Sequence, residues 1–299
     1  MRVSEQVRVG SGLSDLRNVE RSLARLEEQV STGQRIVRPS DDPGGAARVA
    51  RLETMLRRVD TAERVAAGVR SDLEAEDAAL QQLSSLLARA RELGVQGASE
   101  ALSATDRAAL ASEVDSLLGQ ALDLGNTRVD GRYLFAGTTT ETKPFALEDV
   151  GGVTTPTYQG SDVSREVLLG PGQSIEHAAG PEPFAGGGGA LDALVALRDA
   201  LRADDTAAVG AGVEALDTAL DRTTLALGTV GARMSELDAA ADGFASEKVR
   251  IQGLLGELRD VDLSEAIVDL KAQQTAYERG LQVVAGVLKV SILDFVGRL

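Results

Sequence analysis

An apolar stripe with heptad spacing runs through residues 263–299. Its positions step alternately by four and three residues, as in a coiled-coil helix: Leu263, Ile267, Leu270, Gln274, Tyr277, Leu281, Val284, Leu288, Ile292 and Phe295. Asp262 and Glu265 stand where an N-cap and a capping box are expected. At ~1.5 Å per residue such a helix is roughly 55 Å long. One small core cannot cover it, so we expect it to need a helical partner.

A second stripe lies near the start of the chain and ends at the turn signal Ser31-Thr32-Gly33. Its apolar positions are Val9, Leu13, Leu16, Leu23, Leu26 and Val30. Both ends of the chain are therefore predicted to be apolar-striped helices that pair with each other. The C-terminal helix also contains Gly280 and Gly286, each of which costs about 1 kcal/mol relative to alanine. Packing must supply most of its stability.

Between these ends the pattern predicts further long helices. One begins at Pro43, after the capping residue Asp42, and continues to about residue 94. A shorter helix follows from about 103 to 130. From Val209 to Leu258 seven heptads run in register, and their phase breaks at 261–262, which predicts a joint there.

Residues 131–189 have a different character. They hold five of the seven prolines, many Gly and Thr, and short β-branched runs, which predict a small β-rich insert with loops. The expected fold is mainly α: an elongated rod of long helices, with its coiled-coil termini paired and the β-rich insert at the far tip. We divide it into a terminal coiled-coil domain (1–40 plus 263–299), a long-helix bundle (41–130 plus 190–262) and the insert (131–189).

Composition narrows the function. There is no Trp and aromatic residues are 3% of the chain, so we expect an aliphatic core. Because there is no Cys, disulfides and thiolate metal sites are excluded. With His177 as the single histidine, most two-histidine metal sites are excluded and a catalytic triad is disfavoured. We find no signal-peptide pattern and no apolar run of spanning length, so no membrane insertion is expected.

The net charge of −15 argues against a nucleic-acid partner, and it is unevenly distributed. Residues 1–40 carry a net +2, residues 263–299 carry zero, and residues 41–262 therefore carry −17. Near-neutral striped ends are typical of surfaces that become buried in an assembly, and an acidic middle is typical of a solvated surface. Arg17, Arg21 and Arg25 lie four apart; they form either a solvated stripe or a contact with acidic neighbours in an assembly.

No catalytic, cofactor or metal residues are predicted. The pairs Asp41-Asp42 and Asp204-Asp205 stand at predicted helix starts, where capping and the helix dipole favour Asp over a role in acid–base chemistry. His177 is expected in a loop without a nucleophile elbow. The Gly186–Gly189 run is interpreted as a linker, because no Lys-Ser or Lys-Thr follows to make a phosphate loop.

Several segments resemble the flagellin family. Thr32-Gly33-Gln34-Arg35-Ile36, which leads into Pro39-Ser40-Asp41-Asp42-Pro43, is similar to the turn near the start of flagellins. The Pro39–Pro43 part of this turn is more similar to the branch of the family that forms the junction between hook and filament. Three other segments are similar to that branch as well: Tyr133-Leu134-Phe135-Ala136-Gly137, Asp269-Leu270-Lys271 and Ile292-Leu293-Asp294-Phe295-Val296. The ending Phe295-Val296-Gly297-Arg298-Leu299 departs from the leucine-rich ending of flagellins, which also favours the junction branch.

The resemblance implies an extracellular structural subunit of the bacterial flagellum, exported unfolded through the flagellar type III apparatus without a cleaved signal peptide. Its implied partners are other copies of itself in a ring, a neighbouring hook-associated protein, flagellin, and an export chaperone on the C-terminal helix. Flagellin itself is the first alternative, a cytoplasmic coiled-coil signalling module the second, and an enzyme the last.

The predicted mechanism is assembly through the terminal stripes, with ordering of these helices coupled to binding. The predicted interface residues are Leu13, Leu16, Leu23, Leu26, Leu270, Tyr277, Leu281, Val284, Leu288 and Ile292. An ordinary intramolecular core is the other interpretation of these residues. In either case the stripes must be buried against something.

Overall fold

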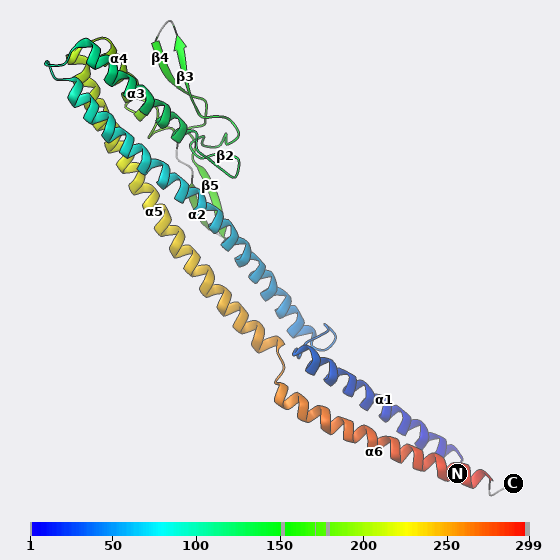
Figure 1. Ribbon diagram of the computed structural model, residues 1–299. Helices are drawn as coiled ribbons and strands as arrows, with labels where there is room; N and C mark the ends of the chain where they lie inside the picture. Colours follow the sequence, from blue (N-terminus) through cyan, green and yellow to red (C-terminus); the bar gives the residue numbers. More distant parts are fainter. Residues whose placement is uncertain (1, 151–152, 171, 178–179, 297–299) are drawn as a thin grey trace. The chain divides into compact units, whose positions relative to one another are not determined.

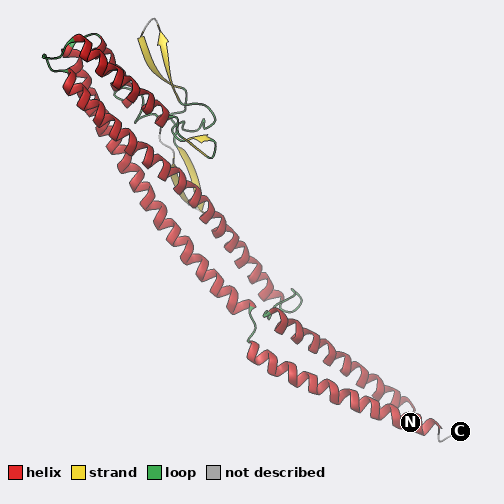
Figure 2. Cartoon of the chain, in the orientation of Figure 1, coloured by secondary structure: helices red, strands yellow, loops and turns green. Residues whose placement is uncertain are grey.

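The computed structural model describes residues 2–150, 153–170, 172–177 and 180–296, and the side chains of all of these except 2–9, 149, 150, 153 and 287–296. The chain divides into two compact units. Unit 1 comprises residues 1–58 and 247–299, and unit 2 comprises residues 59–246. Helices α2 (Pro43–Gly97) and α5 (Thr206–Arg259) contribute residues to both units. Helices dominate the described chain, so the mainly-α prediction is confirmed (Figure 2). The three-part domain division stays a prediction.

In unit 1, helices α1 (Arg2–Thr32) and α6 (Leu263–Val296) lie side by side (Figure 1). They run antiparallel, because Gly12 faces Val284 while Leu16 faces Gly280. The prediction that the two ends of the chain pair with each other is confirmed. The joint predicted at 261–262 is confirmed as well, since α5 ends at Arg259 and α6 begins at Leu263.

In unit 2, α2 and α5 run antiparallel and are joined by ion pairs from Arg70 to Asp238 and from Arg91 to Asp217. Helix α3 (Ala104–Gly125) packs against α4 (Ala190–Arg202). The β-rich insert consists of three antiparallel two-stranded sheets. Their strands pair as β1 (Arg128–Val129) with β2 (Arg132–Tyr133), β3 (Phe145–Val150) with β4 (Val153–Tyr158), and β5 (Arg165–Gly170) with β6 (Gln173–His177).

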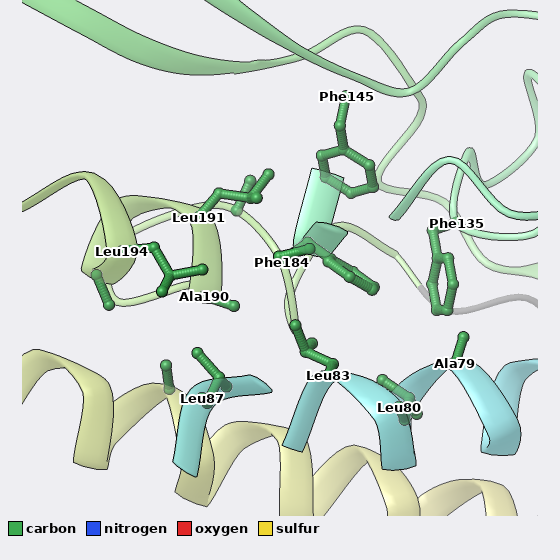
Figure 3. Packing of buried hydrophobic residues seen from close by; sticks show 14 of the residues in the cluster. Ala79, Leu80, Leu83, Leu87, Phe135, Phe145, Phe184, Ala190, Leu191 and Leu194 are labelled. Carbon is green, nitrogen blue, oxygen red and sulfur yellow. The ribbon is translucent and has the colours of Figure 1, made fainter. Parts of the chain in front are cut away.

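The core of unit 2 forms where the insert and α4 cover the α2–α5 pair. On α2 the fully buried residues Leu73, Leu80, Leu83 and Leu87 continue the predicted periodicity. Figure 3 shows side chains of this α2 face opposite Leu191 and Leu194 of α4. Because these positions lose all contact with solvent, each stabilises the fold by about 2 kcal/mol or more. The regular stripe of α2 thus becomes a closed core within unit 2.

The prediction of a purely aliphatic core is wrong at one place. Phe135, Phe145 and Phe184 are fully buried, and the ring centroid of Phe184 lies 4.7 Å from that of Phe135 and 5.3 Å from that of Phe145. Tyr158 joins this cluster and donates its hydroxyl to the carbonyl oxygens of Phe135 and Ser161. Short strands bury little area, so the insert concentrates its few large rings where it meets the helices.

The capping prediction is confirmed for one residue of each Asp pair. Asp42 accepts from the backbone N–H of Gly45 at 2.8 Å, and Asp205 accepts from Ala207 and Ala208 at 3.0 Å. The other residue of each pair does not cap. Asp41 accepts from the backbone N–H of Arg38, and Asp204 pairs with the buried guanidinium of Arg107. None of the described helices is both long and apolar enough to cross a bilayer.

The prediction that His177 lies in a loop is wrong. It is the last residue of β6 and is buried, with its Nδ1 3.5 Å from Oδ2 of Asp72 on α2. Arg165 of β5 lies 3.7 Å from the same carboxylate. Burial, and then the charge of Arg165, lower the pKa of His177. The charged cluster anchors the β5–β6 hairpin to α2.

One helical turn further along α2, the carboxylate of Glu76 is buried with only 2% of the residue exposed. Burial raises its pKa to about 7, against the attraction of Arg233. A folded-state pKa above the unfolded value stabilises the fold at low pH, and this contribution is lost as the pH rises from about 4.5 to about 7.

We therefore expect Glu76→Gln to be more stable than the parent chain at neutral pH. Relative to the variant, the parent should lose about 3 kcal/mol of unfolding free energy between pH 4.5 and pH 7.5. The lowered pKa of His177 adds a contribution to stability that is lost as the pH falls below the ordinary pKa of histidine. This contribution is the same in both chains, so it cancels in the comparison. Chemical denaturation across this pH range measures the difference. Glu74→Gln, an exposed position on α2, is the control, and an equal response in both variants would contradict the account.

Candidate functional site in the terminal helices

The predicted interface residues lie along the contact between α1 and α6. Six of the ten are half-buried in this pair: Leu16, Leu23, Leu26, Leu270, Tyr277 and Val284. Leu13 and Leu281 are 40% and 43% exposed. The side chains of Leu288 and Ile292 lie outside those that the structure describes. The two stripes thus face each other, and each remains partly open to solvent.

The terminal pair lacks the closed core that unit 2 has. No described side chain between residues 10 and 32 of α1 is buried, and on α6 the buried one among residues 263–286 is Ala266. Two helices in contact cover only the stripe between them, and no third layer of described residues covers the rest. Their role as an assembly interface stays a prediction, and their partly exposed side chains have apolar area available for further contacts.

Further apolar residues of α6 lie exposed, both on the stripe and outside it. Val268 and Val283 are 66% and 65% exposed, and Leu263 and Ile267 are also exposed. Sequence reasoning placed Leu263 and Ile267 on the stripe and missed the two valines. The signal was present as apolar residues off the seam. Each valine follows or precedes a stripe position, so its side chain points about 100° away from that position and lies on the outer side of the helix. Apolar side chains on more than one side of α6 fit contact with more than one neighbouring helix.

Glycines let the two helices approach closely. A Cβ placed on Gly280 would lie 3.2 Å from Cδ1 of Leu16, and one on Gly12 would lie 3.5 Å from Cγ2 of Val284. Gly280, which weakens α6 as an isolated helix, therefore provides room for a leucine of α1. Gly286 has no such role within the described chain, because nothing lies within 4 Å of its Cβ position.

The segment 33–42 fastens the start of the chain to the joint between α5 and α6. Gly33, at φ +69°, turns the chain out of α1, and Gln34 forms a β-bridge with Asp260. The N–H of Val261 donates to the carbonyl of Gly33 at 3.0 Å, and that of Arg35 donates to the carbonyl of Arg259 at 2.6 Å. Segments more than two hundred residues apart in sequence are thus held together by backbone hydrogen bonds.

Side chains of the same segment complete this connection. Arg35 donates through Nη2 to the carbonyl of Leu258 at 2.8 Å, and Ile36 is buried. Gly45 is required at the start of α2, because a Cβ there would lie 2.6 Å from Cδ1 of Ile36 and would also clash with Asp42. The hydrogen bond from Gly45, and the nearby Arg35, hold the pKa of Asp42 below its usual value despite some desolvation.

A row of arginines on α1 contacts this segment at one end. Arg25 lies 3.9 Å from Asp41, and Arg38 forms an ion pair of 3.0 Å with Glu28. Arg21 bonds within its own helix, to Asn18 and to the carbonyl of Arg17. These exposed pairs contribute little stability. Only one of the three arginines in the row therefore has an acidic partner from outside α1 among the described residues.

Charge separates along the same lines as the two units. Residues 1–58 and 247–299 together contain 18 Lys or Arg and 16 Asp or Glu, a net of +2, so residues 59–246 carry −17. The nearly neutral unit holds the open apolar face, and the acidic unit holds the closed core. Nothing in the described part of the chain gathers three His, Asp or Glu side chains in a way that could hold a metal ion.

Known proteins are similar to this chain in sequence, above all in its N-terminal and C-terminal helical regions. The family model of the bacterial flagellin N-terminal helical region matches residues 3–140, and that of the C-terminal helical region matches residues 213–296. The flagellar hook-associated protein 3 of Escherichia coli (strain K12) is 29% identical over 300 aligned positions, covering 93% of this chain and 94% of that protein. The flagellar filament 30.7 kDa core protein of Treponema maltophilum is 26% identical, with 86% of each chain covered.

The fold has a counterpart among solved structures. The flagellar hook-associated protein-3 of Legionella pneumophila superimposes with a TM-score of 0.62 at 15% sequence identity. The match covers 70% of this chain and 98% of that one. Together the two family models match both terminal regions and most of the long helices. The chain belongs to the flagellin family.

Proposed function

We propose that this chain is a structural subunit of the bacterial flagellum that forms the junction between hook and filament. The observation that carries the proposal is the paired terminal helices, whose apolar face stays partly open in a single chain. Similarity to hook-associated protein 3 over nearly the whole of both chains supports the junction role.

In this proposal, neighbouring subunits complete the core that the terminal pair lacks. Val268 and Val283, with the exposed part of Ile267, offer apolar area to which a second copy can pack. Burying exposed apolar area at about 25 cal/mol per Å² then favours the assembled state. Unit 2, with its closed core, would fold before assembly, and the terminal helices would gain most of their stability at the assembly site.

The same proposal implies which partners the chain binds and how it is exported. Its partners would be other copies of itself in a ring, a hook-associated protein on one side and flagellin on the other. An export chaperone would cover the apolar face of α6 until the chain leaves the cell without a cleaved signal peptide. We assign it no enzymatic activity, no cofactor and no nucleic-acid partner.

The filament subunit, flagellin, is the second candidate. Similarity to a treponemal filament core protein over 86% of the chain favours it, because the terminal helices serve either role. The junction assignment has the stronger support, since the hook-associated relative is more similar over a longer alignment. A coiled-coil signalling module or an enzyme has no comparable support.

Deleting the gene in its own host distinguishes the two candidates. For a junction subunit we expect bare hooks by electron microscopy, with flagellin released into the medium as monomer because it has nothing to nucleate on. Bare hooks with no flagellin in the medium would instead identify the chain as the filament subunit. Normal filaments would contradict both.

Replacing Leu281 with Asp tests the apolar face itself. Leu281 is 43% exposed, so the change should cost the single chain less than about 1 kcal/mol, whereas a charge buried between subunits costs several. Incorporation of the purified variant onto isolated hooks should fall at least about a hundredfold, with unit 2 unchanged by circular dichroism.

Gln282→Asp is the matched control, because it adds the same charge at an exposed position on the same turn. It should assemble like the parent chain. If Leu281→Asp assembled as well as Gln282→Asp, α6 would not be the assembly surface.

A further inference from the structure

Unit 2 contains a cleft of about 750 Å³ that the flagellar role does not use. It is lined by Glu76 of α2, by residues of α5 from Arg222 to Arg233, and by the loops around Asp162 and Pro181. All of these residues belong to unit 2, so the cleft is complete without the terminal helices.

Glu76 is the unusual feature of this cleft. The residue is 98% removed from solvent, yet among the described residues its carboxylate makes no hydrogen bond and no ion pair. A buried, unpaired carboxylate is costly in its charged form, which is why its pKa rises to about 7. A cationic group placed in the cleft would remove that cost.

The two arginines of the lining already have partners other than Glu76. Arg222 donates to the carbonyl oxygens of Gly186 and Gly187 at 3.2 and 2.9 Å, and Arg233 forms an ion pair of 3.1 Å with Glu176. Asp162 and Glu182 also line the cleft, and neither has an ion-pair partner within the described part of the chain. Arg222 keeps its positive charge, because its partners are neutral carbonyls. The lining groups without an ion-pair partner among the described residues are thus three carboxylates, Glu76, Asp162 and Glu182, against this one guanidinium, and their sum is negative.

Part of the lining is apolar. Leu225 is 73% exposed at the cleft, and Ala226, Val230, Pro181 and Pro183 line it as well. An aliphatic stem can pack along these side chains while its charged end reaches the carboxylate. A cleft of this volume holds more than one side chain, so residues on either side of the cation can bind with it.

We propose that this cleft binds an arginine side chain presented by a protein partner, with the guanidinium on Glu76 and the stem against Leu225 and Val230. Arginine fits better than lysine, because its planar guanidinium pairs with a carboxylate through two hydrogen bonds and is more weakly hydrated. The site adds a contact to unit 2 that does not depend on the terminal helices or on the proposed role in the junction.

Isothermal titration of the full chain with the peptide acetyl-Ala-Arg-Ala-amide tests the proposal. We expect a Kd on the order of 1 mM at pH 7, and at least tenfold weaker binding of the matched peptide in which neutral citrulline replaces arginine. The lysine peptide should also bind more weakly. Glu76→Gln should reduce arginine-peptide affinity at least tenfold, and Glu74→Gln should leave it unchanged.

Proton release provides a second readout. The groups around Glu76 are Asp72 on its own helix, Arg222 and Arg233 on α5, and Asp162 and Glu182 from the loops, with Arg165 and His177 of the hairpin beside Asp72. Because a bound guanidinium favours the ionised form of Glu76, binding at pH 7 should release protons, and the measured enthalpy should depend on the buffer. The Glu76→Gln variant should lose this dependence.

Three results would overturn the proposal: no binding of the arginine peptide, equal binding of the citrulline or lysine peptide, or unchanged binding by Glu76→Gln. None of these results bears on the junction role, since the titration involves no hook and no filament.

Discussion

Two helices packed side by side bury only the stripe along which they touch, and this limit explains the difference between the two units. In unit 2, α4 and the insert add a layer over the α2–α5 pair, so Leu80, Leu83 and Leu87 lose all exposure. In unit 1, α1 and α6 pack on each other through half-buried residues. One part of the chain is therefore self-sufficient, and the other has apolar area left for neighbours.

The segment 33–42 and its backbone bonds to 259–261 give this arrangement a defined connection. In the proposed assembly, the two terminal helices gain stability late, so they must begin from fixed positions to pair in register. The hydrogen bonds of Gly33 and Arg35, the buried Ile36 and the close approach at Gly45 provide such a fixed start. This is why the most recognisable motif of the sequence lies at a turn and not on a helix.

Periodicity predicted most of the fold. The heptads of 209–258 and 263–288, the caps at Asp42 and Asp262 and the break between α5 and α6 are local signals, and the structure follows them. What the sequence did not show depends on residues far apart in the chain. The pairing of Asp72 with His177, the meeting of Phe135, Phe145 and Phe184, and the burial of Glu76 in the cleft lining each need the insert folded onto the helices. Val268 and Val283 were missed for a different reason, since a strict seam leaves out apolar residues on the outer side of the helix.

Hydrogen exchange of the full chain, free and then incorporated onto hooks, tests the central claim most directly. In the free chain we expect backbone amides of 10–32 and 263–286 to exchange at least about a hundredfold faster than those of α2 around Leu80, because opening the terminal pair exposes little buried area. On hooks, the terminal amides should become strongly protected while those around Leu80 change little. Terminal helices as protected in the free chain as the α2 core, with no gain on assembly, would contradict the account.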